Sequence, residues 1–268
     1  MTFSKPKASS PLRLGPLMLT HRIGRVLDLE PSGRAEWEAQ PNPDRAFTGG
    51  LVLSPLLCVL PSAAAPEQGL HTTEQANRWR HIAESVHAHG GKLVARLWLD
   101  RQPKGMVEIA QSHLDDVIEA YRRAAEHAWD AGLDGTEIVV AEGGAVEWIL
   151  SDRGPHLPAN YGPSALERFK ALVEVVQAVI ATRETACVAL CVAHAVASQV
   201  HSRVVELIRQ ERLAYLHIVL SRVDEAEMTA WRTHCRSRLI FSGPFSITAA
   251  VHAIESGLAD GIVPFMAA

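Results

Sequence analysis

Short apolar runs rich in β-branched residues alternate along this chain with longer stretches in which apolar residues recur every three or four positions. The short runs have the length of buried strands, and the longer stretches have the period of amphipathic helices. The predicted strands are Gly24–Leu29, Leu51–Leu57, Lys92–Trp98, Thr136–Val140, Cys187–Ala193, Tyr215–Leu220, Leu239–Phe241 and Gly261–Val263. Strands that alternate with helices in this way indicate βα units with a parallel sheet.

The stretches between these strands predict the helices. They are expected at Thr73–Ala88, Leu114–Ala131, Ala165–Thr182, Ser202–Gln210, Glu225–His234 and Ile247–Ser256. Ser246 is a candidate N-cap of the last helix, and Gly257 lies just past its end. This element order predicts an α/β fold of the (β/α)8 TIM-barrel type. A chain of 268 residues has the usual length of such a barrel, so we expect residues 1–268 to form a single domain.

Charge and composition exclude several classes of function. Lysine plus arginine (26) nearly balances aspartate plus glutamate (30), which gives a net charge of -4 and makes nucleic acid and anionic membranes unlikely partners. The start of the chain lacks the apolar core of a signal peptide, and no later run is long and apolar enough for a transmembrane segment. The four cysteines form no C-x-x-C pair and are expected to be reduced thiols. Together these features predict a cytoplasmic protein.

Four stretches of the chain form a recognisable set. They are Pro11–Ile23, His87–Trp98, Ala131–Ile138 and Phe241–Phe245 with Gly257–Gly261. In this order and at these separations they resemble the old yellow enzyme family, which consists of flavin-dependent ene-reductases built on a (β/α)8 barrel. The resemblance implies a barrel with an N-terminal hairpin. Because the sequence stops at Ala268, soon after the eighth strand, the final helix is expected to be missing or truncated.

Several positions that would contact the flavin differ from the family pattern. After the first strand, Val26-Leu27-Asp28-Leu29 stands where the family has an Ala-Pro-x-Thr stretch that holds the flavin ring. At the end of the third strand, Arg96 replaces the glutamine whose amide would face the isoalloxazine. The fifth strand, Cys187–Ala193, lacks the arginine that the family places beside the flavin N1 edge.

The substrate clamp and the phosphate site differ as well. The family's fourth strand ends in a pair of substrate ligands followed by a tyrosine that donates a proton, and the aligned residues here are Val139, Glu142 and Gly144. Missing donors of this kind typically cost several kcal/mol of transition-state stabilisation. The phosphate site reads Gly243-Pro244 and Pro264-Phe265-Met266, and proline has no amide N–H to donate.

These replacements lead to the expectation that the protein uses no cofactor, FMN included. Three hypotheses follow from different classes of protein. The first is a non-redox enzyme that catalyses an acid–base isomerisation, cyclisation or elimination on a small, mainly apolar substrate. The second is a non-catalytic barrel that binds a ligand or stabilises a partner. The third is an FMN-dependent NAD(P)H ene-reductase with an atypical site.

Polar residues at the strand ends supply the candidate site of the first hypothesis. Glu142 is the candidate general acid or base, and His194 or Asp28 is the second proton-transfer group. Arg96 is the candidate fixed cation, and Trp98 and Arg222 are further candidate substrate-binding residues. No set of residues shows the spacing of metal ligands, so no metal is expected.

A purely structural role for some of these residues stays open. Asp28 with Arg96, and Glu142 with another arginine, could be ion pairs that fill the former flavin cavity, because a buried arginine requires a carboxylate partner. His217 lies within a strand and is expected to be structural. The side left bare by the absent final helix is a candidate surface for a homo-oligomer or a partner subunit.

Overall fold

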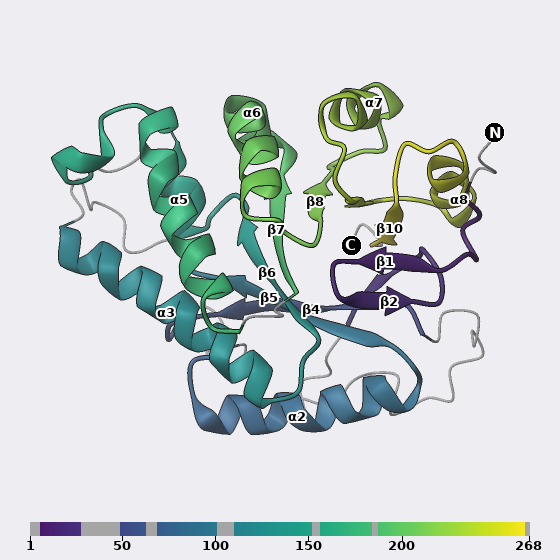
Figure 1. The fold of residues 1–268 in the computed structure, drawn as a ribbon, viewed down its shortest axis with the longest axis horizontal. Helices are drawn as coiled ribbons and strands as arrows, with labels where there is room; N and C mark the ends of the chain where they lie inside the picture. The colour runs from purple at the N-terminus through teal and green to yellow at the C-terminus, as the bar shows by residue number, and fades with distance from the viewer. Residues whose placement is uncertain are drawn as a thin grey trace.

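A parallel barrel forms the centre of this protein (Figure 1). The computed structural model describes residues 6–27, 49–62, 69–100, 110–151, 156–183 and 187–265, except that the side chains of residues 194–199 are not described. The barrel sheet has 8 strands in the order β3 to β10, and neighbours in this order are parallel. A parallel bridge between Ile23 and Ile262 brings the first strand beside the last.

The strands lie close to their predicted positions. They are β3 (Arg25–Val26), β4 (Leu51–Cys58), β5 (Lys92–Trp98), β6 (Gly135–Val140), β7 (Val188–Ala193), β8 (Leu216–Val219), β9 (Leu239–Gly243) and β10 (Gly261–Pro264). The largest difference is β3, which is shorter than the predicted Gly24–Leu29. The end of that prediction, from Asp28 onward, lies outside the described residues.

Helices surround the barrel on its outer side (Figure 1). They are α2 (Thr73–Ala88), α3 (Gln111–Asp130), α4 (Ala145–Leu150), η2 (Ala159–Tyr161), α5 (Ala165–Ile180), α6 (His194–Gln210), α7 (Glu225–His234) and α8 (Ile247–Glu255). Capping boxes at Thr72 and Ser164 fix the starts of α2 and α5, and Ser246 caps α8 as predicted. No helix within the described part of the chain has both the length and the apolarity that a membrane crossing requires.

Three helical segments were not predicted, and one of them is the single-turn 3-10 helix η2. The short helix α4 follows the Gly143-Gly144 turn directly, and its 6 residues are too few to show a helical period. Helix α6 begins at His194, before the predicted start at Ser202, and its backbone departs from helical angles at Val200 (φ -123°, ψ 18°). This kink separates a first turn from the regular helix, so only the regular part carries a clear amphipathic pattern.

An antiparallel hairpin closes the amino-terminal end of the barrel. It consists of β1 (Leu12–Leu14) and β2 (Leu17–Leu19), and its four inward leucines are buried against the lower barrel interior. Val94, Ala189 and Tyr215 belong to this same apolar cluster. Side chains of a strand alternate between its two faces. The residue two positions further along each of these strands therefore also points inward, and it lies one layer nearer the carboxyl-terminal end of the barrel.

Candidate functional site

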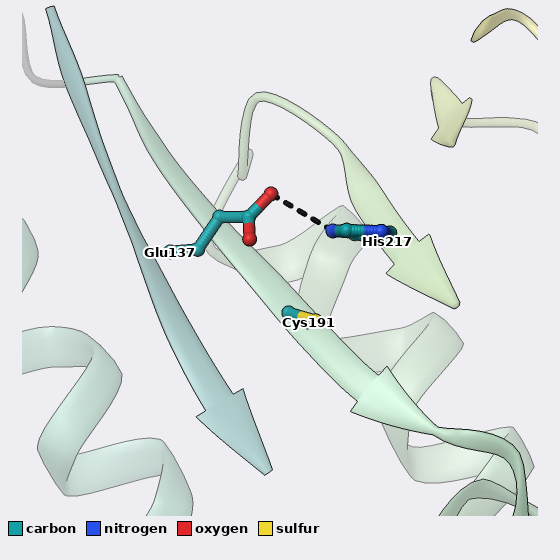
Figure 2. A group of neighbouring side chains, drawn as sticks. All are labelled: Glu137, Cys191 and His217. Atoms are coloured by element: carbon teal, nitrogen blue, oxygen red, sulfur yellow. Dashed lines mark hydrogen bonds and ion pairs between the residues drawn. The ribbon is translucent and has the colours of Figure 1, made fainter. Parts of the chain in front are cut away.

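A buried polar cluster lies above this apolar layer. Two residues beyond Val94, Ala189 and Tyr215 come Arg96, Cys191 and His217, and Glu137 of β6 faces them. The carboxylate oxygen Glu137 Oε1 accepts hydrogen bonds from Tyr215 Oη at 2.8 Å and from His217 Nδ1 at 3.0 Å. Figure 2 shows Glu137 and His217 pointing toward each other across the barrel, with Cys191 beside them on the strand between.

Arg96 completes the cluster on the side of β5. Its Nε atom lies 3.6 Å from Glu137 Oε2, and its main-chain N–H donates to Ser54 Oγ at 2.9 Å. The Arg96 side chain is 15% exposed, whereas those of Glu137 and His217 are 0% and 1% exposed. Arg96 therefore links the buried carboxylate to the solvent-accessible end of the barrel.

The charges of the cluster stabilise one another. Burial by itself would raise the pKa of Glu137, but His217, then Arg96 and Tyr215, outweigh burial and lower it. Burial by itself would lower the pKa of His217, but its neighbours Cys191 and Glu137 raise it to about 10. Both shifts favour the charged forms of Glu137 and His217, and Arg96 adds a second cation to the cluster.

Three buried atoms of this cluster have spare hydrogen-bonding capacity. Arg96 Nε, Glu137 Oε2 and His217 Nε2 have no hydrogen-bond partner among the described residues. A buried polar atom without a partner costs about 1–3 kcal/mol, and such atoms are concentrated at functional sites. Two of the three belong to the cations Arg96 and His217, and a positive charge at this depth would attract an anionic ligand group at the barrel mouth.

The same cluster contains three residue types that can bind metals. Ligand atoms of Glu137, Cys191 and His217 lie within 4.8 Å of one another. However, His217 would have to release a proton whose pKa is raised to about 10, and the Arg96 guanidinium faces the same carboxylate. The charge of the cluster therefore favours an anion over a metal cation, and the absence of a metal stays a prediction.

The loops after β4, β5 and β6 are joined to one another at the barrel mouth. Asp100 pairs with Gly144 in an isolated bridge, and the Asp100 carboxylate accepts from Ser62 Oγ at 3.1 Å. Trp98 packs against this junction, because a Cβ atom on Gly144 would lie 2.7 Å from Trp98 Nε1. The position aligned with the family's proton-donating tyrosine therefore has no room for a side chain while Trp98 stays in place.

Backbone hydrogen bonds close the ends of β9 and β10. The main-chain N–H groups of Phe245 and Phe265 both donate to Gly243 O, at 2.7 Å and 3.0 Å. A Cβ atom on Gly243 would lie 2.9 Å from Leu220 O, so this backbone is packed tightly against β8. Pro244 and Pro264, which flank these residues, have no amide hydrogen to donate.

The structure brings only some of the candidate site residues together. Glu142 is exposed on the turn between β6 and α4. Arg222 is 82% exposed and contacts Asp224, the N-cap of α7, at 3.0 Å. Arg96 contacts Glu137 of β6, so a buried carboxylate partner of the kind that we expected exists, but it is not the one that we named.

Two of the candidates cannot be placed. Asp28 lies outside the described residues, and His194 begins α6 with a side chain that the structure does not describe. Their proposed proton-transfer roles stay predictions, as does that of Glu142.

Sequence reasoning missed Glu137, Tyr215 and Cys191 as members of one site. Glu137 carried a usable signal, because a carboxylate in the middle of the apolar strand Gly135–Val140 requires buried partners. The role of His217 agrees with its expected structural character, since both of its protein neighbours in the cluster lie inside the barrel.

Comparisons with known proteins support the sequence resemblance. No family model matches the chain. It is 28% identical over 211 residues to 12-oxophytodienoate reductase 1 of Oryza sativa subsp. japonica, a match that covers 64% of this chain and 54% of that protein. It is also 28% identical over 294 residues to 12-oxophytodienoate reductase 7 of the same plant, which covers 84% of this chain and 74% of the relative.

A solved structure extends this likeness to the whole fold. The old yellow enzyme homologue from Zymomonas mobilis superposes with a TM-score of 0.77 over 96% of this chain and 88% of its own, at 22% sequence identity. The chain is a homologue of the old yellow enzyme family. Its barrel and N-terminal hairpin are those that the family resemblance implied.

The comparisons correct one expectation about this old yellow enzyme homologue. The prediction that it works without a cofactor is wrong, because its relatives are reductases of a flavin-dependent family. The replaced contact positions led to that prediction, but they show only that individual contacts differ. Among the three hypotheses, the comparisons favour the flavin-dependent reductase over the non-redox enzyme.

The two ends of the barrel mouth fit a flavin to different degrees. Near β5 and β6, Arg96 provides a cation whose side chain is 15% exposed, and a positive charge there suits the negative charge of a reduced flavin ring. At the ends of β9 and β10, the amides of Phe245 and Phe265 are already used within the protein. The described residues therefore fit the ring and do not fit its phosphate.

Proposed function

We propose that this old yellow enzyme homologue is a flavin-dependent ene-reductase with an atypical site. The family likeness supports this proposal, and the names of the plant relatives describe reductases of 12-oxophytodienoate. When bound, a flavin supplies hydride for the reduction of a carbon–carbon double bond. The reductant in this proposal is NAD(P)H.

The observation that carries the proposal is the position of Arg96. Its guanidinium emerges from the buried cluster at the carboxyl-terminal end of the barrel, where the active sites of (β/α)8 barrels lie. Glu137 forms an ion pair with this cation, and His217 and Tyr215 donate hydrogen bonds to the Glu137 carboxylate. A cation fixed in this way stabilises negative charge without the cost of reorganisation.

The walls around this cation suggest the class of substrate. Val139 is buried and offers no hydrogen bond, Glu142 is exposed, and Gly144 has no side chain. A substrate carbonyl would receive little polarisation from these three positions. We therefore expect alkenes that are already strongly electron-poor, such as nitroalkenes or maleimides, to react faster than simple cyclic enones.

The experiment is a measurement of bound flavin followed by turnover. The purified chain is mixed with excess flavin and desalted, and its visible absorbance is compared with its protein content. NADPH oxidation is then followed without oxygen, with and without a maleimide. We expect a yellow protein and oxidation that depends on the alkene. A colourless protein with no alkene-dependent oxidation would refute the proposal.

A further inference from the structure

We propose that this protein binds flavin through the ring system and that the phosphate contributes little, so riboflavin and FMN bind with similar affinity. This inference rests on the proposed flavin-dependent function and specifies the form of its cofactor. It follows from the backbone at the ends of β9 and β10 and not from the buried cluster.

The loops after the seventh and eighth strands are the usual phosphate site of (β/α)8 barrels. In this chain those strands are β9 and β10, which end at Gly243 and Pro264. A phosphate there normally receives several main-chain N–H groups and the charge of a basic side chain.

The main-chain donors of the two Pro-Phe pairs that follow Gly243 and Val263 are either missing or already used. Pro244 and Pro264 have no N–H group. The N–H groups of Phe245 and Phe265 both point to Gly243 O. Turning either amide toward a ligand would break its hydrogen bond to Gly243 O, and the contact of Gly243 with Leu220 O leaves the backbone little freedom to shift. The net gain from such an exchange is small.

Positive charge is also missing from this part of the sequence. From Gly243 to Ala268 the chain contains no lysine and no arginine. The start of α8 remains as a source of favourable dipole, where the Ser246 side chain accepts from the main-chain N–H of Ala249 at 3.1 Å. At an exposed position the dipole of a helix N-terminus attracts an anion only weakly, and salt screens it.

The ring end of the site contrasts with this phosphate end. Arg96 is paired with Glu137, and its side chain is 15% exposed, so its charge remains available to a ring at the barrel mouth. Riboflavin and FMN share the ring and differ only in the phosphate. If recognition is confined to the ring, the two molecules have nearly the same binding free energy.

The test compares the dissociation constants of riboflavin and FMN for the full chain, by quenching of flavin fluorescence. We expect the two constants to agree within about threefold, which corresponds to ~0.7 kcal/mol. We also expect 50 mM inorganic phosphate to leave FMN binding unchanged. A wild-type preference for FMN of a hundredfold or more would overturn the inference and leave the proposed function intact. If neither flavin binds, the proposed function fails as well.

A charge-introducing variant supplies a second readout. Ile247, which is 53% exposed at the start of α8, is changed to arginine. We expect Ile247→Arg to increase the preference for FMN over riboflavin by roughly tenfold at low salt, because a cation then faces the phosphate. The matched control is Met18→Arg, which replaces another exposed apolar residue, 58% exposed, on the hairpin at the opposite end of the barrel.

The control should leave the ratio of the two constants unchanged. If Ile247→Arg and Met18→Arg give the same ratio as wild type, the phosphate does not lie near α8, and the ends of β9 and β10 are not the reason for its small contribution. If Ile247→Arg alone favours FMN, the phosphate lies where the structure lacks donors, which supports it.

Discussion

Arg96 and Glu137 face each other across adjacent strands, with Arg96 Nε 3.6 Å from Glu137 Oε2 inside the barrel. The carboxylate is fully buried, and the guanidinium reaches toward the mouth. Glu137 therefore contributes to the stability of the barrel interior, and Arg96 contributes the charge that a ligand at the mouth would contact.

Removal of the buried carboxylate should destabilise the protein. In Glu137→Gln, Arg96 and His217 lose their shared anion and become two buried cations without a counter-charge. We expect a loss of about 3–5 kcal/mol in the free energy of unfolding, measured by urea denaturation. The exposed Glu142→Gln is the matched control and should change this free energy by less than about 0.5 kcal/mol. Equal effects of the two variants would show that Glu137 is not paired as described.

His217 should make stability depend on pH between neutral and mildly alkaline conditions. Its folded-state pKa is raised to about 10 from an ordinary value of 6.5. A raised pKa means that its stabilising contribution is complete below pH 6.5 and is lost as the pH rises toward 10. We expect the free energy of unfolding of wild type to fall between pH 6.5 and 8.5, and His217→Asn to flatten that part of the curve.

The pH range of this experiment lies below the titration of two buried thiols. Burial raises the pKa values of the thiols of Cys58 and Cys235 above their ordinary value of 9.0, so these groups begin to act only above that pH. A wild-type curve with the same slope as that of His217→Asn between pH 6.5 and 8.5 would contradict a protonated His217.

Replacement of Arg96 should change the redox properties of a bound flavin more than its affinity. Arg96→Gln removes the cation that would stabilise the anionic, reduced form. We expect the two-electron potential to fall by about 30–60 mV, equivalent to a ten- to hundredfold change in the equilibrium. The potential is measured by titration against a reference dye.

The control for this experiment is Arg222→Gln, which removes the same charge from a side chain that is 82% exposed. Its potential should match that of wild type. A potential in Arg96→Gln that equals wild type would place the ring away from this cation.

A side chain at position 144 should disturb the barrel mouth. In Gly144→Ala the new Cβ would lie 2.7 Å from Trp98 Nε1, so the indole must move. We expect a loss of about 1–3 kcal/mol in the free energy of unfolding and a shifted tryptophan emission spectrum. Trp98→Phe removes the clashing nitrogen, so the double variant Trp98→Phe with Gly144→Ala should cost less than the sum of its parts. Simple additivity would show that the contact is not the cause.

The strands and helices of this protein were largely predictable from local patterns. Helices α2 and α7 begin and end as predicted, because apolar residues recur at helical spacing between clear caps. The 6-residue helix α4 escaped prediction, since a single short turn has no measurable period. Among the candidate site residues, Arg96 was predicted as a fixed cation, but its partner Glu137 was not.

The sequence by itself determined the alternation of strands and helices, the barrel and the family likeness, because each depends on local periodicity or on short motifs. Only the tertiary structure decided which side chains meet. Glu137 and His217 are 80 positions apart, and their contact exists because the barrel places β6 and β8 on either side of β7 with both side chains directed inward. In the same way, only the folded backbone shows that the N–H groups of Phe245 and Phe265 donate to the same carbonyl oxygen. Such convergence depends on register and closure of the sheet, which no local pattern encodes.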